Sequence, residues 1–160
     1  MKKAIGIFMC LVIGLFFVGC ESEKESLVFE DLEIEVKMQV GEDKRAVQEN
    51  TSILIEDTAK DYSLGVISVD KTKGKTIDEI YDTYIVGGGK KEKTELSDNL
   101  IFIDVLNEVD SVVLGERKDK MYCFIFYDKK TGAVLYGRFF ENNERDDVIN
   151  LAKSIEVIKI

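Results

Sequence analysis

The first twenty residues constrain this chain most, because they determine which part of it is available to fold. Lys2 and Lys3 are followed by an unbroken apolar run over residues 4–19, and then by Cys20 and a charged stretch. A positive start, a short apolar segment and a small residue before a cleavage point are the features of an export signal. We therefore expect residues 1–19 to be a signal peptide that is removed from the mature protein.

This segment ends in Phe17-Val18-Gly19-Cys20, and its last three residues resemble the lipobox of bacterial lipoproteins. The resemblance implies cleavage before Cys20, acylation of its sulfur and anchoring in the cell membrane on the exported side, at the extracellular face or in the periplasm. Phe17 stands where that family usually has leucine. Two alternatives remain open. The run is short for an uncleaved membrane helix, which needs roughly 20 residues, and Phe17 fits an ordinary secretory cleavage site poorly.

The rest of the chain is predicted to form one folded unit. We expect a charged tether over residues 20–26 and a single domain over residues 27–160, a length typical of one domain. With Cys10 removed and Cys20 acylated, Cys123 has no cysteine partner, which excludes a disulfide framework. Asp and Glu outnumber Lys and Arg by 31 to 22, a net charge of −9. Such a surface disfavours nucleic acid and anionic headgroups as partners.

Hydrophobic periodicity predicts a chain rich in strands. Ile34, Val36, Met38 and Val40 alternate with charged and polar residues, as in an antiparallel strand with one buried face. Further strands are predicted over residues 52–56, 64–70, 100–105, 111–116, 121–127 and 133–140. Turns or loops are expected at 41–44, 57–61, 71–75 and 128–132, with a bend at 107–108. Residues 90–99 are polar and receive no assignment.

Two helices are predicted from their capping residues and apolar faces. Thr76 and Glu79 are spaced as a capping box, and the face that follows is apolar at Ile77, Ile80, Tyr81, Tyr84 and Ile85. Glycines at 87–89 are expected to end this helix. Asn142 or Asn143 is expected to cap the second helix, whose buried stripe is Val148, Ile149, Leu151, Ala152 and Ile155, with Ile158 and Ile160 in a short tail.

Three strands, a helix, four strands and a helix predict an α+β domain, with a mostly antiparallel sheet flanked by two helices. With the ending Leu151-Ala152-Lys153-Ser154-Ile155, this order resembles the PsbP-like fold, a family widespread among bacterial exported proteins. The chain has no proline or tryptophan, which that family often carries after its first strand. The resemblance concerns the order of elements, so it implies no residue roles, and the family includes members that are not enzymes.

The absence of histidine limits the chemistry available to this chain. Ser-His-Asp and Cys-His catalytic arrangements and histidine-bound zinc or iron sites are excluded. Cys123 lies between aromatic residues on a predicted central strand, so we expect a buried and unreactive thiol instead of a nucleophile. The glycines at 87–89 precede Lys90, but Lys91 stands where a phosphate-binding loop needs serine or threonine.

Acidic and aromatic pairs offer weaker alternatives. Asp57 with Asp61, or Asp146 with Asp147, could bind calcium or share acid–base work. We expect Asp146 and Asp147 to face the positive end of a helix dipole instead. The tyrosines of the first helix could line a ligand groove, although a core-facing stripe is the preferred interpretation.

We therefore expect a lipid-anchored binding domain with no catalytic residues, no metal and no cofactor. Its partners are expected to be the membrane, through the lipid on Cys20, and an envelope protein bound by the sheet or its loops. A surface lipoprotein that binds a small ligand or a cation is the alternative, and an enzyme of unknown type ranks third. Residues 87–99 are predicted to be a mobile contact region, because long polar loops often carry function.

Overall fold

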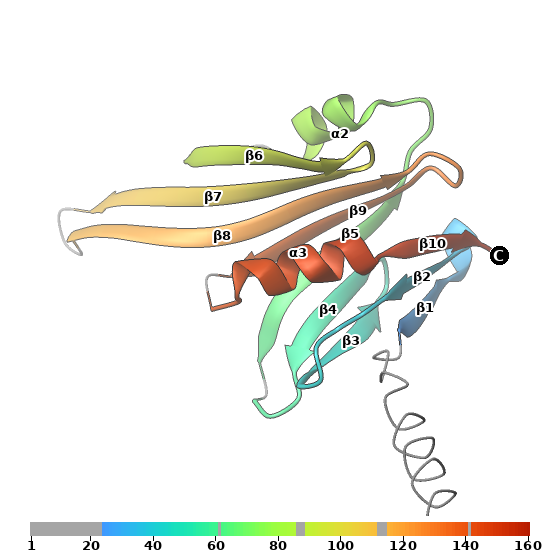
Figure 1. Ribbon diagram of the computed structural model, residues 1–160, viewed down its shortest axis with the longest axis horizontal. Helices are drawn as coiled ribbons and strands as arrows, with labels where there is room; N and C mark the ends of the chain where they lie inside the picture. Colours follow the sequence, from blue (N-terminus) through green and yellow to red (C-terminus); the bar gives the residue numbers. More distant parts are fainter. Residues whose placement is uncertain (1–23, 61, 86–88, 112–114, 141) are drawn as a thin grey trace, which may run out of the picture.

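Two antiparallel β-sheets and two α-helices form the part of the chain that the computed structural model describes, residues 24–60, 62–85, 89–111, 115–140 and 142–160 (Figure 1). Side chains are described for these residues except over 107–111 and 115–119. The architecture confirms the predicted α+β class. Cys20 and the predicted signal segment lie outside the described residues. Neither helix within them has the length and apolar content needed to cross a bilayer.

The larger sheet has seven strands in the order β3-β4-β5-β9-β8-β7-β6. They are β3 (Lys44–Glu49), β4 (Ser52–Asp57), β5 (Ser63–Lys71), β6 (Lys90–Ser97), β7 (Leu100–Ser111), β8 (Gly115–Asp128) and β9 (Ala133–Phe140). The predictions for β4, β5 and β9 are confirmed, and so is the turn between β8 and β9. Asp128 closes that turn by accepting hydrogen bonds from the amide and hydroxyl of Thr131 at 2.9 and 2.6 Å.

The smaller sheet has three strands and joins the two ends of the described chain. Its order is β1 (Glu25–Phe29), β2 (Ile34–Met38) and β10 (Glu156–Lys159). β2 confirms the alternation, because its three apolar residues are fully buried. The predicted tail at Ile158 is instead part of β10, and β1 takes in the last two residues of the predicted tether. Both short strands form because β2 offers each of them a free edge.

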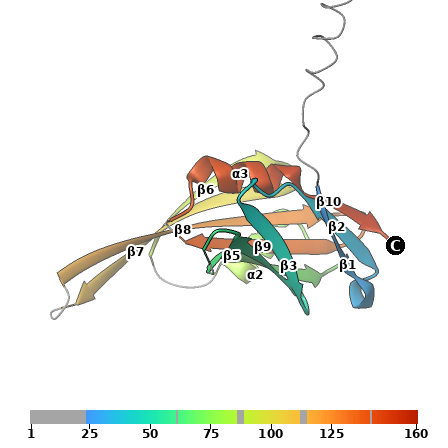
Figure 2. The ribbon, with the colours of Figure 1, turned by 90° about the horizontal axis from the view of Figure 1, so that it is seen from below.

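The helices cover opposite faces of the larger sheet (Figure 2). On one face, α2 (Ile77–Tyr84) packs through Ile80 against apolar residues of β7, β8 and β9. On the other, α3 (Arg145–Ser154) and the smaller sheet share a core with the large sheet. All five residues of the stripe predicted for α3 are buried. The sheet is therefore buried on both faces near its middle.

The two helix starts differ in how well the sequence predicted them. The capping box of α2 is confirmed, since Thr76 Oγ1 accepts from the amide of Glu79 at 3.3 Å and Glu79 accepts from the amide of Thr76 at 2.7 Å. The predicted cap of α3 is wrong. Glu144 occupies the N-cap position without a side-chain hydrogen bond. Asn143 donates instead to the carbonyls of Leu64 and Phe140, both at 2.9 Å.

β7 and β8 form a ribbon that extends beyond the sheet (Figure 1). The bend predicted at 107–108 is wrong, because β7 is continuous through these residues and pairs with β8 as far as Ser111. The pairing of β6 with β7 ends at Leu106, and that of β9 with β8 ends at Met121. Beyond these points, β7 and β8 pair only with each other among the strands that the structure describes.

Residues 90–97 form strand β6, which corrects the prediction of a mobile contact loop over 87–99. β6 pairs with β7 from Lys90 opposite Leu106 to Ser97 opposite Leu100. It is the outermost strand of its sheet, and outermost strands commonly carry charged residues that discourage pairing with other chains. The polar sequence therefore reflects an edge position. Deletion of this segment would remove a paired strand, so the thermal midpoint should fall.

Candidate functional site

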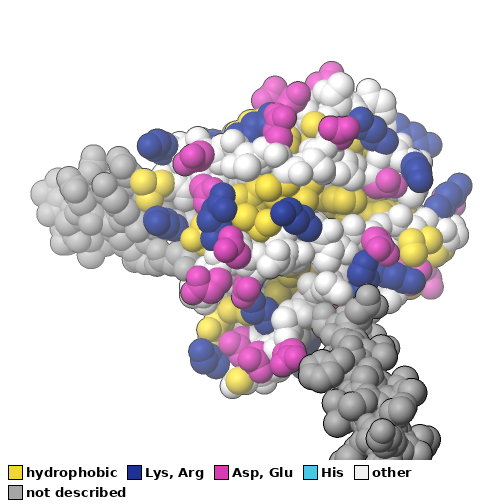
Figure 3. Space-filling view, in the orientation of Figure 1, with side chains coloured by type: hydrophobic (Ala, Val, Ile, Leu, Met, Phe, Trp, Pro, Cys, Tyr) yellow, Lys and Arg dark blue, Asp and Glu magenta, His cyan; other side chains and the backbone are white. Residues whose placement is uncertain are grey.

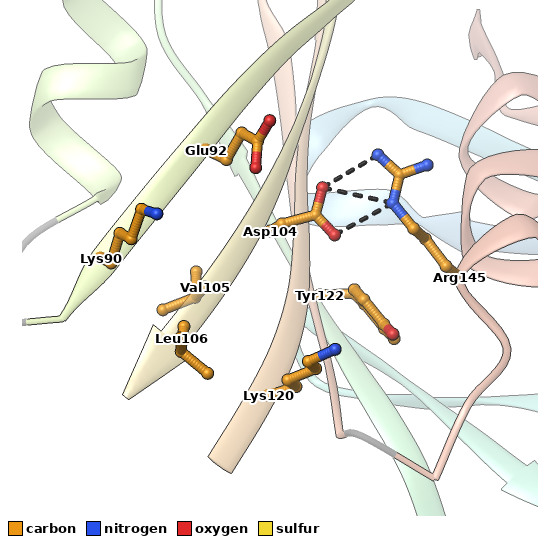
Figure 4. Close-up of a pocket in the computed structure, with 8 residues that line it drawn as sticks. All are labelled: Lys90, Glu92, Asp104, Val105, Leu106, Lys120, Tyr122 and Arg145. Atoms are coloured by element: carbon orange, nitrogen blue, oxygen red, sulfur yellow. Dashed lines mark hydrogen bonds and ion pairs between the residues drawn. The ribbon is translucent and has the colours of Figure 1, made fainter. Parts of the chain in front are cut away.

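The face of the molecule that carries α3 shows a strip of hydrophobic side chains bordered by cationic and anionic ones (Figure 3). A pocket of about 360 Å³ lies on this side, where the strands β6, β7 and β8 pass the start of α3 (Figure 4). Its lining comes from four elements: Lys90 and Glu92 from β6, Asp104, Val105 and Leu106 from β7, Lys120 and Tyr122 from β8, and Arg145 from α3.

Strand register arranges most of this lining in two rows across the sheet. Glu92, Asp104 and Tyr122 lie opposite one another on β6, β7 and β8. The next row contains Lys90, Leu106 and Lys120 in the same way. Residues paired across antiparallel strands project from the same face at about 5 Å spacing. The second row therefore places two lysines on either side of a leucine.

An ion pair between Arg145 and Asp104 forms one wall of the pocket (Figure 4). Arg145 Nε donates to Oδ1 and Oδ2 of Asp104 at 3.0 and 3.2 Å, and its Nη2 donates to Oδ2 at 2.9 Å. These hydrogen bonds raise the pKa of the Arg145 guanidinium above its ordinary value. Two-point pairing of this kind fixes the plane of the guanidinium as well as its position.

Aromatic rings pack against the Arg145 side of the same ion pair. The guanidinium carbon of Arg145 lies 4.8 Å from the ring centroid of Phe102, and Phe102 stacks on Tyr122 at 6.1 Å. Phe102 is fully buried, so this platform belongs to the core. The buried stripe of α3 holds the backbone of Arg145, since Arg145 is the first residue of that helix. Both partners of the ion pair are thus attached to rigid elements.

The sequence predictions did not identify this pocket. One signal was available: Asp104 interrupts the apolar run of β7 on the face that buries Leu100 and Phe102. An acid at such a position needs a partner. The partner, Arg145, lies 41 residues further along the chain, and nothing in the local pattern pairs the two.

The acids singled out from the sequence have structural roles where they are described. Asp57 accepts hydrogen bonds from the amides of Ala59 and Lys60 at 2.8 and 3.0 Å, while Asp61 lies outside the described residues. Asp146 and Asp147 occupy the first turn of α3, as predicted, and Asp147 also accepts from Lys44 at 3.0 Å. In the described part of the chain, no group of three or more cysteine or acidic side chains is arranged to hold a metal ion.

The tyrosine face of α2 packs against the core, as the preferred interpretation predicted. Tyr81 and Tyr84 contact the cluster around Ile80. The hydroxyl of Tyr84 donates to Asp70 at 2.7 Å, and the ring of Tyr84 lies 5.7 Å from that of Tyr136. Burial and the contact with Asp70 raise the pKa of Tyr84 above its ordinary value. This tyrosine therefore stays protonated at neutral pH.

Cys123 is buried on the α2 face of the sheet, which confirms its predicted placement. Its side chain is 1% exposed, and its sulfur accepts a hydrogen bond from the hydroxyl of Tyr136 at 3.7 Å. Burial raises the pKa of the Cys123 thiol. A protonated, inaccessible thiol is a poor nucleophile.

Substitution of Cys123 by serine is expected to lower the free energy of unfolding by about 1–3 kcal/mol, because a hydroxyl replaces sulfur at a buried site whose neighbours, apart from the Tyr136 hydroxyl, are mostly apolar. Denaturant titration measures this change. Cys123→Ala serves as the control, since it removes the sulfur without adding a polar group. The native thiol should also resist maleimide, and rapid labelling of the folded protein would contradict the expectation.

Comparisons with known proteins assign no family to the chain. The sequence matches no family model, and a search of curated proteins gives no match either.

Proposed function

We propose that this chain is an exported lipoprotein, anchored through Cys20, whose folded part binds a small ligand and does not catalyse a reaction. The lipobox resemblance at residues 18–20 supports the anchor. The pocket between β6, β7, β8 and α3 supports the binding function. Its volume of about 360 Å³ falls within the range of roughly 300–1,000 Å³ typical of small-molecule sites.

The observation that carries the proposal is the Arg145–Asp104 pair in the pocket wall. Its three hydrogen bonds and the Phe102 ring hold it in one geometry, yet the Arg145 side chain remains 42% exposed. A charged group that is fixed before the ligand arrives loses little conformational freedom on binding. A purely structural surface ion pair contributes little to stability, so its position in a pocket favours recognition.

The chemistry of the lining favours binding over catalysis. Arginine keeps its proton at neutral pH and cannot act as a general base. Asp104 accepts every hydrogen bond of the pair, so both of its carboxylate oxygens already have a partner. The chain also has no histidine, the residue that most often transfers protons near neutral pH. Fixed charges around an apolar surface are suited to holding a ligand.

We further propose that the domain has a PsbP-like arrangement. A mostly antiparallel sheet with α2 on one face and α3 on the other supports this proposal. The late position of α3, directly after the last strand of the larger sheet, agrees with the order on which the resemblance rests.

The test is to purify the full chain from membranes in a nonionic detergent and to analyse small molecules released from it by mass spectrometry. Wild-type protein should carry a bound ligand. The Arg145→Gln variant should carry at least about tenfold less of it, because a charge-assisted hydrogen bond contributes about 1.5–3 kcal/mol to binding. Lys130→Gln is the matched control. It removes one positive charge from the exposed turn between β8 and β9.

Equal ligand content in wild type and Arg145→Gln would contradict the proposal. Reproducible turnover on a substrate panel, lost on replacement of a single carboxylate, would contradict its non-catalytic part.

Docking of an envelope protein is a second candidate, favoured by the β7–β8 ribbon. The backbone of this ribbon projects beyond the strands on either side (Figure 1), and isolated two-stranded ribbons are only marginally stable in water. A partner that packs on it would add contacts that stabilise the ribbon. A protein that co-purifies equally with wild type and with Arg145→Gln would favour this candidate.

A further inference from the structure

We propose that the ligand of this pocket carries a phosphate or carboxylate group on an apolar body, an inference that rests on the small-ligand binding proposed above. The anionic group would lie over the row of Lys90, Leu106 and Lys120. The apolar body would lie against Leu106 and the ring of Tyr122. Three observations lead to this ligand class: the charge balance of the lining, the donors that remain available, and the apolar floor between them.

The charge balance of the pocket is opposite in sign to that of the chain. The lining contains three cations and two acids, whereas the whole sequence has a net charge of −9. Asp104 is paired with Arg145, and Lys90 lies beside Glu92 on β6 in the same lining. A local positive excess on an acidic protein attracts anions to this position.

Hydrogen-bond donors remain available on two of the cations. Arg145 uses Nε and Nη2 for Asp104, and its Nη1 makes no hydrogen bond to any residue that the structure describes. Lys90 likewise makes no ion pair with a described residue. Phosphate and carboxylate oxygens are the acceptors that ammonium and guanidinium groups bind most strongly.

The lysine row also has a suitable shape for one anionic group. Lys90 and Lys120 both lie opposite Leu106, so their backbones are about two strand spacings, or roughly 10 Å, apart. The Lys90 side chain is long enough to bring its ammonium group onto an anion that lies over Leu106 in this row. Leu106 lies between them and offers an apolar contact to the rest of the ligand.

Glu92 makes the sign of the ligand charge testable. It lies on the same face of β6 as Lys90, two residues away, and lines the same pocket. Replacing Lys90 by glutamine should weaken an anion, whereas replacing Glu92 by glutamine should strengthen it. A cationic ligand would reverse both effects. Both positions lie on the outermost strand, so neither change disturbs the core.

The experiment is calorimetric titration of the full chain, in nonionic detergent, with phenyl phosphate, benzoate and benzylamine as probes. Phenyl phosphate and benzoate should bind, and benzylamine should not. Lys90→Gln should weaken phenyl phosphate binding about tenfold, as loss of one charge-assisted hydrogen bond would. Glu92→Gln should strengthen it about threefold, the size of a partly screened surface charge interaction. Lys130→Gln, remote from the pocket, should leave it unchanged.

Two further probes separate the sources of the anionic group. Phosphatidylcholine vesicles with and without phosphatidylglycerol are added to the same variants, alongside inorganic phosphate. Binding to the anionic vesicles that Lys90→Gln weakens would support the proposal with a lipid headgroup as ligand. Binding of phenyl phosphate without vesicle binding would support it with a soluble ligand.

Stronger binding of benzylamine than of phenyl phosphate would overturn the proposal. Equal affinities of wild type, Lys90→Gln and Glu92→Gln for phenyl phosphate would overturn it as well. Either result would leave the proposed binding function intact, provided that Arg145→Gln still lowers the amount of ligand released from the purified protein. If wild type and Arg145→Gln release equal amounts, the binding function itself is contradicted.

Discussion

Truncation of Phe124 to alanine is expected to lower the free energy of unfolding by about 3–5 kcal/mol, as the loss of a buried phenylalanine commonly does. Phe124 is fully buried on β8, where its ring lies over Gly137 of β9 and stacks on Phe139 at 6.0 Å. This ring fills the space that a side chain at position 137 would occupy. Its removal therefore leaves a cavity in the core shared with α3 and the smaller sheet.

Phe140→Ala is the matched control for this prediction. The residue lies next to Phe139 on the same strand and is 58% exposed, so the same truncation should change stability by no more than about 0.5 kcal/mol. Urea titrations of both variants measure the difference. Equal effects at the two positions would contradict the assignment of Phe124 to the core.

Gly137 provides a stricter test of the same contact. A methyl group at position 137 would overlap the ring of Phe124, so Gly137→Ala alone should cost about 1–3 kcal/mol through overpacking. In the Phe124→Ala background, the same methyl group enters the cavity instead. The two substitutions together should therefore cost less than their sum. Additive effects would show that the ring and the glycine are not in contact.

The sequence predicted those elements whose own residues carry the pattern. Ile34, Val36 and Met38 alternate with charged residues because only one face of β2 is buried. These three apolar residues were enough to predict the strand and its buried face. The start of α2 was predictable for a similar reason, since the two residues of its capping box stand three apart. Local patterns of this kind need no knowledge of distant neighbours.

The elements that sequence reasoning missed depend on distant partners. β6 is polar and was predicted to be a loop, yet it forms a strand because β7 offers it hydrogen bonds and apolar neighbours. β10 pairs with β2, which lies more than a hundred residues earlier. The pocket is assembled in the same way, from the 41-residue separation between Asp104 and Arg145. Its individual residues are ordinary strand and helix residues until the fold brings them together.

The anchor is the feature of the proposed function that a single substitution should affect most. Cys20→Ala is expected to abolish acylation, so that the protein leaves the membrane fraction or keeps residues 1–19 uncut. Two acyl chains give stable anchoring, at about 0.8 kcal/mol for each buried methylene, whereas one chain binds only marginally. Cell fractionation shows whether the protein stays with the membrane. Intact-mass measurement shows whether it is acylated and cleaved, because the acyl chains and the signal segment each add a defined mass.

Cys10→Ala is the control that separates a lipid anchor from the other interpretations of this segment. Cys10 lies inside the apolar run, so its replacement should leave cleavage and acylation unchanged. An ordinary secretory signal would be cleaved alike in both variants, and an uncleaved membrane helix would keep both in the membrane at full length. A wild-type mass without acyl chains would rule out the anchor. β1 begins at Glu25, only a few residues after Cys20 in the sequence. Acylation at Cys20 would therefore hold the smaller sheet close to the bilayer surface.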